Sequence, residues 1–183
     1  MAVRPPVCNF GWKAKNFNLP STNGEVVSLD DLKNSTASLV IFICNHCPYV
    51  ISAMERLIFD SQELMTVGVK VVAICSNDPI AYPDDSFEKM KVFTKKHKLP
   101  FPYLHDKSQK VARDYGAECT PDFFGFNAEM ELNYRGRLDD AGSTGKLSHQ
   151  RDRDLVIAMK QIIATGQGPD IQFPSMGCSI KWK

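Results

Sequence analysis

The uncharged run Ser38–Ile43 is the strongest feature of the hydrophobic pattern. Four of its six residues are β-branched or aromatic, which predicts a strand buried on both faces. After Pro48, apolar residues recur at helical spacing from Val50 to Met65, and Gly68 marks the helix end. Proline suits the first turn of a helix. We therefore expect Cys44 at the end of a strand and Cys47 at the start of a helix.

The remaining pattern predicts an α/β fold. The elements expected in chain order are a hairpin (16–20 and 25–28) around Asn23-Gly24, a short helical piece (29–33) capped by Ser28, a strand (69–75), a helix (85–98) capped by Asp85 and Glu88, a short strand (103–104), a small helix (108–115), an antiparallel edge pair (123–126 and 132–135), a last helix (155–163) and an irregular tail (167–183) packed around Phe173 and Trp182. The strand–helix–strand order at 38–75 implies a parallel right-handed crossover.

Length and composition indicate one globular domain spanning residues 1–183. Hydrophobic residues make up 43% and charged residues 23%, and the net charge of +1 offers no electrostatic basis for binding nucleic acid or anionic membranes. The N-terminus lacks an apolar signal segment and no apolar run approaches ~18 residues, so we expect a cytoplasmic protein. The six cysteines are sparse and unevenly spaced, which favours reduced thiols with one redox pair over a disulfide scaffold.

Cys44 and Cys47 are separated by two residues and form the candidate redox pair. The unpaired amides of a helix N-terminus favour a thiolate, and His46 adds positive charge when it is protonated. We predict that Cys44 is the attacking thiolate and Cys47 the resolving thiol of a thiol–disulfide exchange. This interpretation requires that the two sulfurs lie within bridging reach and that they are not both buried away from solvent.

Five sequence blocks resemble the thioredoxin fold, with the N-terminal hairpin of the redoxin branch (the alkyl hydroperoxide reductase/thiol-specific antioxidant group). The chain is similar above all to bacterial thioredoxin-like proteins described as thiol-disulfide isomerase/thioredoxin. The blocks span nearly the whole chain: Cys44-Asn-His-Cys-Pro-Tyr-Val50, Phe101-Pro-Tyr-Leu104, Cys119-Thr-Pro-Asp-Phe-Phe124, Tyr134-Arg-Gly-Arg-Leu-Asp-Asp140 and Gly177-Cys-Ser-Ile-Lys-Trp-Lys183. The resemblance implies a central mixed sheet flanked by helices, and a redox enzyme that needs no cofactor.

The resemblance also implies a substrate site around Thr120 and Pro121. Pro121 matches the cis-proline that faces the two cysteines in this fold, and Thr120 would offer its backbone to an extended substrate. Asn45 and Pro48 complete the predicted substrate-binding residues. Two features depart from thioredoxin: Ile43 replaces the usual tryptophan, and the preceding strand contains no acid. A proton acceptor must then come from elsewhere, with Glu118 as one candidate.

The other cysteines and acids receive weaker predictions. Cys119 adjoins the cis-proline and is either a third redox centre or a small buried apolar residue. Cys75 is expected to be structural, Cys8 incidental, and the role of Cys178 stays open. The acidic pairs 84–85 and 139–140 are expected to be solvated or capping residues.

A peroxidase is the main alternative. Cys47-Pro48 aligns with the peroxide-attacking cysteine of peroxiredoxins, but Val40 and Cys44 stand where that family carries proline and threonine. Either enzyme would act on a disulfide-bearing protein or on a small thiol or peroxide, and would need a separate electron donor.

A Cu(I)-binding metallochaperone is a third possibility. Its ligands would be Cys44, Cys47 and either His149 or His46, because thiolates are soft ligands. A structural zinc site is disfavoured, because only one such cysteine pair is present where four ligands are needed. We expect no resident metal.

Overall fold

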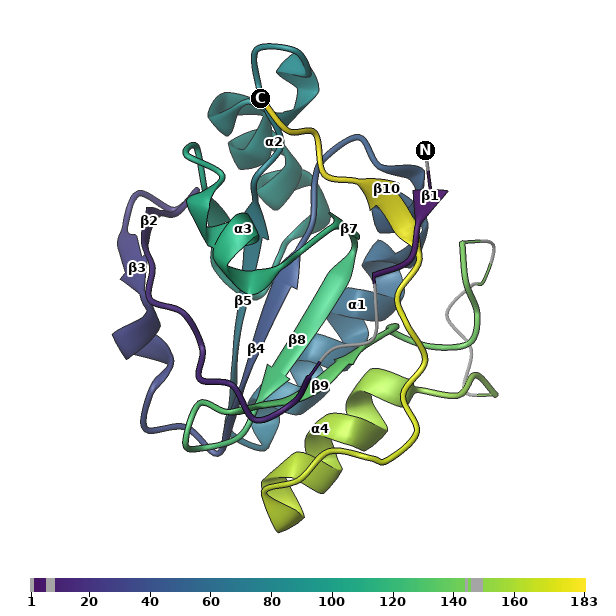
Figure 1. Ribbon diagram of the computed structural model, residues 1–183. Helices are drawn as coiled ribbons and strands as arrows, with labels where there is room; N and C mark the ends of the chain where they lie inside the picture. Colours follow the sequence, from purple (N-terminus) through teal and green to yellow (C-terminus); the bar gives the residue numbers. More distant parts are fainter. Residues whose placement is uncertain (1, 6–8, 144, 146–149) are drawn as a thin grey trace.

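A five-stranded mixed sheet forms the centre of the protein, in the strand order β6-β5-β4-β8-β9 (Figure 1). The computed structural model describes residues 2–5, 9–143, 145 and 150–183. The strands are β4 (Ala37–Phe42), β5 (Val69–Cys75), β6 (Tyr103–His105), β8 (Asp122–Phe126) and β9 (Leu132–Gly136). β4, β5 and β6 run parallel to one another, and β8 runs antiparallel to both of its neighbours, β4 and β9. The predicted crossover and edge pair are confirmed, and β4 is buried along its whole length.

Helices cover both faces of the sheet. The helices are α1 (Pro48–Thr66), α2 (Phe87–His97), α3 (Lys110–Tyr115) and α4 (Asp154–Thr165), with short 3-10 turns η1 (Leu29–Leu32) and η2 (Pro83–Asp85). Leu39 and Ile41 of β4 pack with side chains of α1, α2 and α4. Val40 and Phe42, which point to the other face, pack with α3 and the N-terminal hairpin. The alternation along β4 therefore fills two apolar layers, one on each side of the sheet.

The predicted N-terminal hairpin is confirmed as β2 (Asn18–Pro20) and β3 (Val26–Ser28). Gly24 supplies the positive φ of +94° that its turn requires. Ser28 begins η1, and its backbone N–H and hydroxyl both donate to the Asp31 carboxylate, at 2.8 and 2.7 Å. This agrees with the predicted capping role of Ser28.

The C-terminal tail differs from the prediction, because it contains a strand. β10 (Gly177–Ser179) lies between β1 (Ala2–Val3) and β7 (Cys119–Thr120) in a second, three-stranded sheet (Figure 1). A Cβ on Gly177 would lie 2.0 Å from the Thr120 carbonyl oxygen, so this close approach requires glycine. Phe173 and Trp182 are 47% and 39% exposed and do not form the predicted core of the tail.

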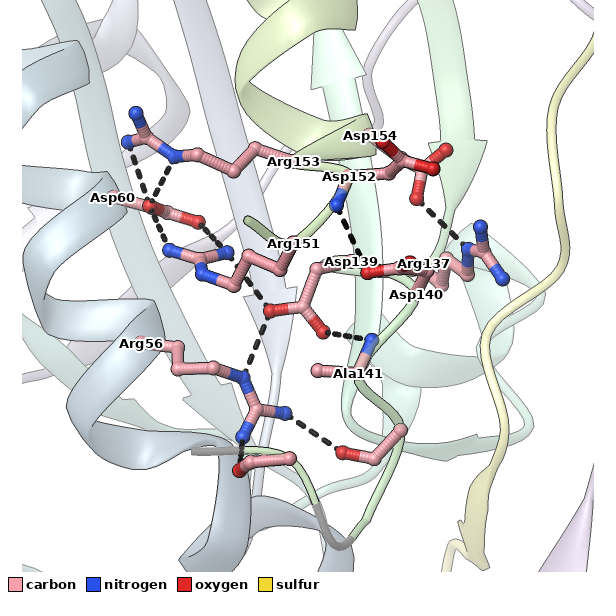
Figure 2. Close-up of polar contacts among 12 residues, drawn as sticks. Arg56, Asp60, Arg137, Asp139, Asp140, Ala141, Arg151, Asp152, Arg153 and Asp154 are labelled. Atoms are coloured by element: carbon pink, nitrogen blue, oxygen red, sulfur yellow. Dashed lines mark hydrogen bonds and ion pairs between the residues drawn. The ribbon is translucent and has the colours of Figure 1, made fainter. Parts of the chain in front are cut away.

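Both acidic pairs contain a buried member, which corrects a second prediction. Helix α2 begins at Phe87 with Ser86 as its N-cap, so Asp85 is not a capping residue but a fully buried one. Asp139 is also buried, in a network of charges that joins α1, α4 and the loop between β9 and α4 (Figure 2). None of the described helices combines the length and the apolar character that a membrane span needs.

Candidate active site

The local positions of the two cysteines agree with the sequence prediction. Cys44 follows the end of β4, and Cys47 is the N-cap of α1, with an extended backbone (φ −69°, ψ 121°). Pro48 occupies the first helical position, where its missing N–H leaves no hydrogen bond unmade, and it is exposed. The buried strand and the proline-started helix together hold both sulfurs at the tip of α1.

Thr120 faces both sulfurs. Its hydroxyl oxygen lies 3.3 Å from Cys44 Sγ, and its carbonyl oxygen accepts from Cys47 Sγ at 3.1 Å. The two thiols are also close enough to shift each other's pKa in opposite directions. The Thr120–Pro121 peptide bond is cis, as the resemblance implied. The structure therefore brings Cys44, Cys47, Thr120 and Pro121 together.

The pKa of the Cys47 thiol is lowered and that of the Cys44 thiol is raised, which favours Cys47 as the thiolate of the pair. The pKa of Cys47 is lowered because the Cys44 thiol donates to its sulfur, assisted by Cys178 and by the Val50 N–H. The pKa of Cys44 is raised because Cys44 is that donor, because it is buried, and because the Asp85 carboxylate is near. The Thr120 carbonyl oxygen carries partial negative charge and disfavours a thiolate on Cys47. The lowered pKa of Cys47 means that the hydrogen-bond donors have the larger effect.

Asp85 is the acid beside the pair, and the sequence prediction missed it. Its Oδ2 lies 2.8 Å from His46 Nδ1, and its Oδ1 accepts the Asn45 N–H at 2.8 Å. Asn77 Nδ2 also donates to Asp85, at 2.7 Å. Asp85 is thus a buried acid beside Cys44, although β4 itself contains none. It could not be recognised beforehand because a Pro-Asp-Asp turn is typical of solvated loops.

Three other predicted residues have contacts that limit their roles. Asn45 Nδ2 donates to the Asp84 carbonyl, and Asn45 Oδ1 accepts from the Tyr103 hydroxyl, so the fold already uses this side chain. His46 is partly exposed and stacks on Tyr82 with ring centroids 5.6 Å apart. Glu118 is exposed beside a different surface pocket, which disfavours it as the proton acceptor.

Both active-site cysteines are buried, which contradicts the predicted accessibility. The exposed fraction is 1% for Cys44 and 0% for Cys47. β10 covers them: Cys178 pairs with Thr120 in the register of β10 and β7, and its side chain packs on the same core cluster. Cys178 itself is partly exposed. Of the described thiols in contact with Cys47, only Cys178 is open to solvent.

Cys75 and Cys119 have the character of buried structural thiols. Burial raises the pKa of Cys75 to about 12 and raises that of Cys119 as well. Cys119 Sγ makes a long 3.5 Å contact with the Pro121 carbonyl. These observations favour the small apolar interpretation for Cys119 over a redox role. Cys8 and His149 lie outside the described residues.

Cys44, His46 and Asp85 form the one group among the described residues with metal-ligand spacing, their donor atoms lying within 4.8 Å of one another. Cys47 is not part of this group. Both carboxylate oxygens of Asp85 already accept hydrogen bonds from the protein. A single thiolate with a hard carboxylate is also a poor match for Cu(I).

Comparisons with known proteins agree with this geometry. The model of the AhpC/TSA family matches residues 10–136. A Coxiella burnetii protein named as a peroxiredoxin is 31% identical over 63% of this chain and 71% of its own length. The chain spans about half the length of the chloroplastic peroxiredoxin Q proteins that it also matches.

Solved structures show the same fold. An uncharacterized conserved protein from Geobacillus kaustophilus superimposes with a TM-score of 0.93 and 40% identity, over 100% of this chain and 97% of that one. A hypothetical protein from Sinorhizobium meliloti gives 0.89 and 38%, over 98% of both chains. The thioredoxin domain of a Bacteroides vulgatus thiol-disulfide oxidoreductase, at 17% identity, covers 70% of this chain and 89% of its own with a TM-score of 0.60. The expected thioredoxin-like α/β fold and redoxin resemblance are confirmed. The chain belongs to the AhpC/TSA family.

Proposed function

We propose that the protein is a thiol–disulfide oxidoreductase that works through the Cys44–Cys47 pair. The observation that carries this proposal is that both thiols contact the same residue, Cys44 through the Thr120 hydroxyl and Cys47 through the Thr120 carbonyl. Because both sulfurs are buried in this conformation, β10 must first be displaced from Thr120. Cys47 then attacks a substrate disulfide and forms a mixed disulfide, releasing one substrate thiol. Cys44 then attacks the Cys47 sulfur, which forms the Cys44–Cys47 disulfide and releases the second substrate thiol.

Cys44 must lose its proton for the second step, and Asp85 is the group that supports this transfer. Its carboxylate is buried beside Cys44 and acts on the Cys44 thiol through its charge. His46, in contact with the same carboxylate and partly exposed, links it to solvent. The pair of Asp85 and His46 therefore gives the Cys44 proton a route out of the site.

Substrate recognition is proposed for Thr120, Pro121 and Pro48, which border the sulfurs. Because β10 already pairs with Thr120, an extended protein substrate reaches this edge only by displacing β10. A cavity of about 140 Å³ lies beside Pro121 and is lined also by Phe123, Arg137 and Met176, but by neither cysteine. A small thiol, disulfide or peroxide held there would be next to the site and not yet at the sulfurs. The partner is thus a disulfide-bearing protein or a small redox molecule, with a separate electron donor.

Insulin reduction driven by dithiothreitol tests the proposal. The Cys47→Ser variant is expected to lose activity, and Cys44→Ser to accumulate a mixed disulfide on Cys47 that mass spectrometry detects. Ser52→Ala is a suitable control, because its hydroxyl bonds only to the Tyr49 carbonyl within α1. Undiminished activity in Cys44→Ser would refute the assigned pair.

A peroxidase is the second candidate, favoured by one specific observation. Cys47, the thiol that aligns with the peroxidatic cysteine, is the one with the lowered pKa, and it is the N-cap of α1. Relatives named as peroxiredoxins support the same candidate. Peroxide consumption that requires Cys47 and survives Cys44→Ser distinguishes this function from dithiol exchange.

Two further parts of the proposal have separate tests. A cytoplasmic location, supported by the sparse cysteine distribution, is checked by cell fractionation.

The metallochaperone alternative, for which Cys44 and His46 lie close together, is checked by anaerobic Cu(I) titration of the reduced protein. Stoichiometric tight binding would favour that alternative over a redox enzyme.

A further inference from the structure

Three thiols, not two, meet at the tip of α1. The side chain of Cys178 in β10 packs on the cluster that contains Cys44 and Cys47, and Cys178 helps to lower the pKa of Cys47. It also lies opposite Thr120, the residue that contacts Cys44 and Cys47. Cys47 therefore has two neighbouring thiols, Cys44 and Cys178, and these are its two candidate disulfide partners.

The segment that carries Cys178 is held on both sides. Before it, the Ser175 hydroxyl donates to the buried Asp122 carboxylate at 2.9 Å. After it, the Ile180 N–H donates to the Glu118 carbonyl at 2.9 Å, and the Lys181 N–H donates to Asn77 Oδ1 at 2.9 Å. These hydrogen bonds on both sides fix the position of Cys178 in the site.

The three thiols differ in access to solvent. Cys44 and Cys47 are 1% and 0% exposed, whereas Cys178 is partly exposed. A reductant from solvent therefore cannot reach a Cys44–Cys47 disulfide directly in this conformation, because thiol–disulfide exchange needs direct attack on a sulfur. It can reach Cys178.

We propose that Cys178 is a third redox thiol, through which an external dithiol reduces the buried pair. This inference rests on the proposed function. In the first step the Cys178 sulfur attacks Cys47 of the Cys44–Cys47 disulfide. A Cys47–Cys178 bond forms, the Cys44–Cys47 bond breaks, and Cys44 takes up the proton that Cys178 loses. No electrons enter the protein in this exchange.

The external dithiol supplies the electrons in the second step. One of its thiols attacks the exposed Cys178 sulfur and expels Cys47, forming a mixed disulfide with Cys178. The second thiol of the dithiol then attacks its own sulfur in that bond, which releases Cys178 and leaves the reductant as a disulfide. The protein gains two electrons and two protons, held as the Cys44 and Cys47 thiols.

The acidities of the thiols support the second step, in which Cys47 is the leaving group. Burial raises the pKa of Cys178 to about 11, whereas the pKa of Cys47 is lowered by its donors. A lower thiol pKa makes a better leaving group, so an attack on the Cys47–Cys178 bond expels Cys47 and leaves the reductant on Cys178. That is also the sulfur that solvent reaches.

Peptide mapping and reduction kinetics test the inference. After oxidation of Cys44→Ser with diamide, non-reducing mass spectrometry is expected to find a Cys47–Cys178 peptide. In stopped-flow mixing with dithiothreitol, the Cys44–Cys47 disulfide of oxidised Cys178→Ser is expected to be reduced at least about tenfold more slowly than that of the parent. Ser179→Ala, on the same strand with all three thiols intact, is expected to keep the parent rate. Circular dichroism verifies that each variant folds.

The outcomes separate this inference from the proposed function. If Cys178→Ser still forms the Cys44–Cys47 disulfide and is reduced at the parent rate, the inference is overturned and the proposed function stands. Absence of the Cys47–Cys178 peptide from oxidised Cys44→Ser also overturns the inference. If neither the parent protein nor Cys178→Ser forms a Cys44–Cys47 disulfide, the proposed function and the inference both fail.

Discussion

Asp85 Oδ2 lies 2.8 Å from His46 Nδ1, so a buried carboxylate is tied to the segment between the two cysteines. The same carboxylate accepts the Asn45 N–H, and its charge helps to raise the pKa of Cys44. One acid from η2 thus both accepts a hydrogen bond from the turn and contributes to the raised pKa of Cys44. In the proposed function, Asp85 is the proton acceptor for Cys44.

Replacing Asp85 with Asn is expected to slow the resolving step at neutral pH by at least about tenfold, because the proton acceptor for Cys44 is lost. Without the nearby negative charge the pKa of Cys44 falls, so the variant should recover its rate as the pH rises. The measurement is the pH profile of mixed-disulfide decay. Asp84→Asn, at the exposed neighbouring position, should match the parent. Equal profiles for Asp85→Asn and the parent would contradict this role.

Much of the fold could be predicted from local pattern. The uncharged run that became β4 and the proline-started helix α1 placed Cys44 and Cys47 correctly, because burial and helix initiation are encoded within a few residues. The match of Thr120-Pro121 to the cis-proline position also correctly predicted the loop that faces the two cysteines. These features depend on neighbours in sequence, which a single chain shows directly.

Contacts between distant segments could not be predicted in this way. Asp85 looks like a solvated turn residue, yet Asn45 and Asn77 satisfy its carboxylate in the interior. The tail carries no strand-like alternation, and β10 forms only because Gly177 permits close approach to Thr120. The burial of Cys44 and Cys47 follows from that pairing, so it too was beyond local pattern.

The three-thiol arrangement predicts an order of reactivity towards N-ethylmaleimide. Cys178 is expected to react first in the native reduced protein, because its side chain is partly exposed whereas those of Cys44 and Cys47 are buried. Raising the pH towards about 11 should accelerate this reaction as the Cys178 thiolate forms. Peptide mass spectrometry after timed quenching gives the order.

Loosening β10 provides the matched test. Ser175→Ala removes the hydroxyl that bonds to Asp122 and is expected to speed labelling of Cys47 without adding a thiol. Ser52→Ala, on α1 away from this anchor, should leave labelling unchanged. Labelling of Cys47 in the native parent as fast as in urea would show that β10 does not cover the site.

The charge network in Figure 2 predicts a large stability effect at Arg151. Its guanidinium bonds to Asp60 at 2.6 and 2.9 Å and to Asp139 at 2.8 Å, and all three side chains are buried. Arg151→Ala leaves Asp60 with Arg153 and Asp139 with Arg56, but it removes three buried charge-assisted hydrogen bonds and should lower the free energy of unfolding by about 3–5 kcal/mol. Lys160→Ala, which breaks an exposed pair with Glu63, should cost at most about 1 kcal/mol. Urea unfolding measures both, and similar losses in the two variants would contradict the network's importance.

His105 predicts a loss of stability at mildly acidic pH. Burial, the largest cause, holds the pKa of His105 below its ordinary value of 6.5, with Asp106 opposing and Lys107 and Lys183 assisting. Its buried Nε2 has no hydrogen-bond partner among the described residues. Its ring stacks on that of Phe87, with the ring centroids 5.4 Å apart. The unfolded chain therefore binds a proton more readily than the folded one.

The sign of the effect follows from that difference. The folded protein has its full stability with respect to His105 above about pH 6.5, where the imidazole is neutral in both states. This stability is lost as the pH falls towards the lowered pKa of His105 in the folded state, because the unfolded chain takes up the proton first. His105→Phe, which keeps the ring stack on Phe87 but cannot bind a proton, should therefore show a shallower loss of unfolding free energy between about pH 7 and pH 5. The measurement is urea unfolding at several pH values, with pH 8 as the reference at which the imidazole is neutral in both states. Because other groups titrate in both proteins, only the difference in slope counts, and identical slopes would exclude His105 as a source of acid sensitivity.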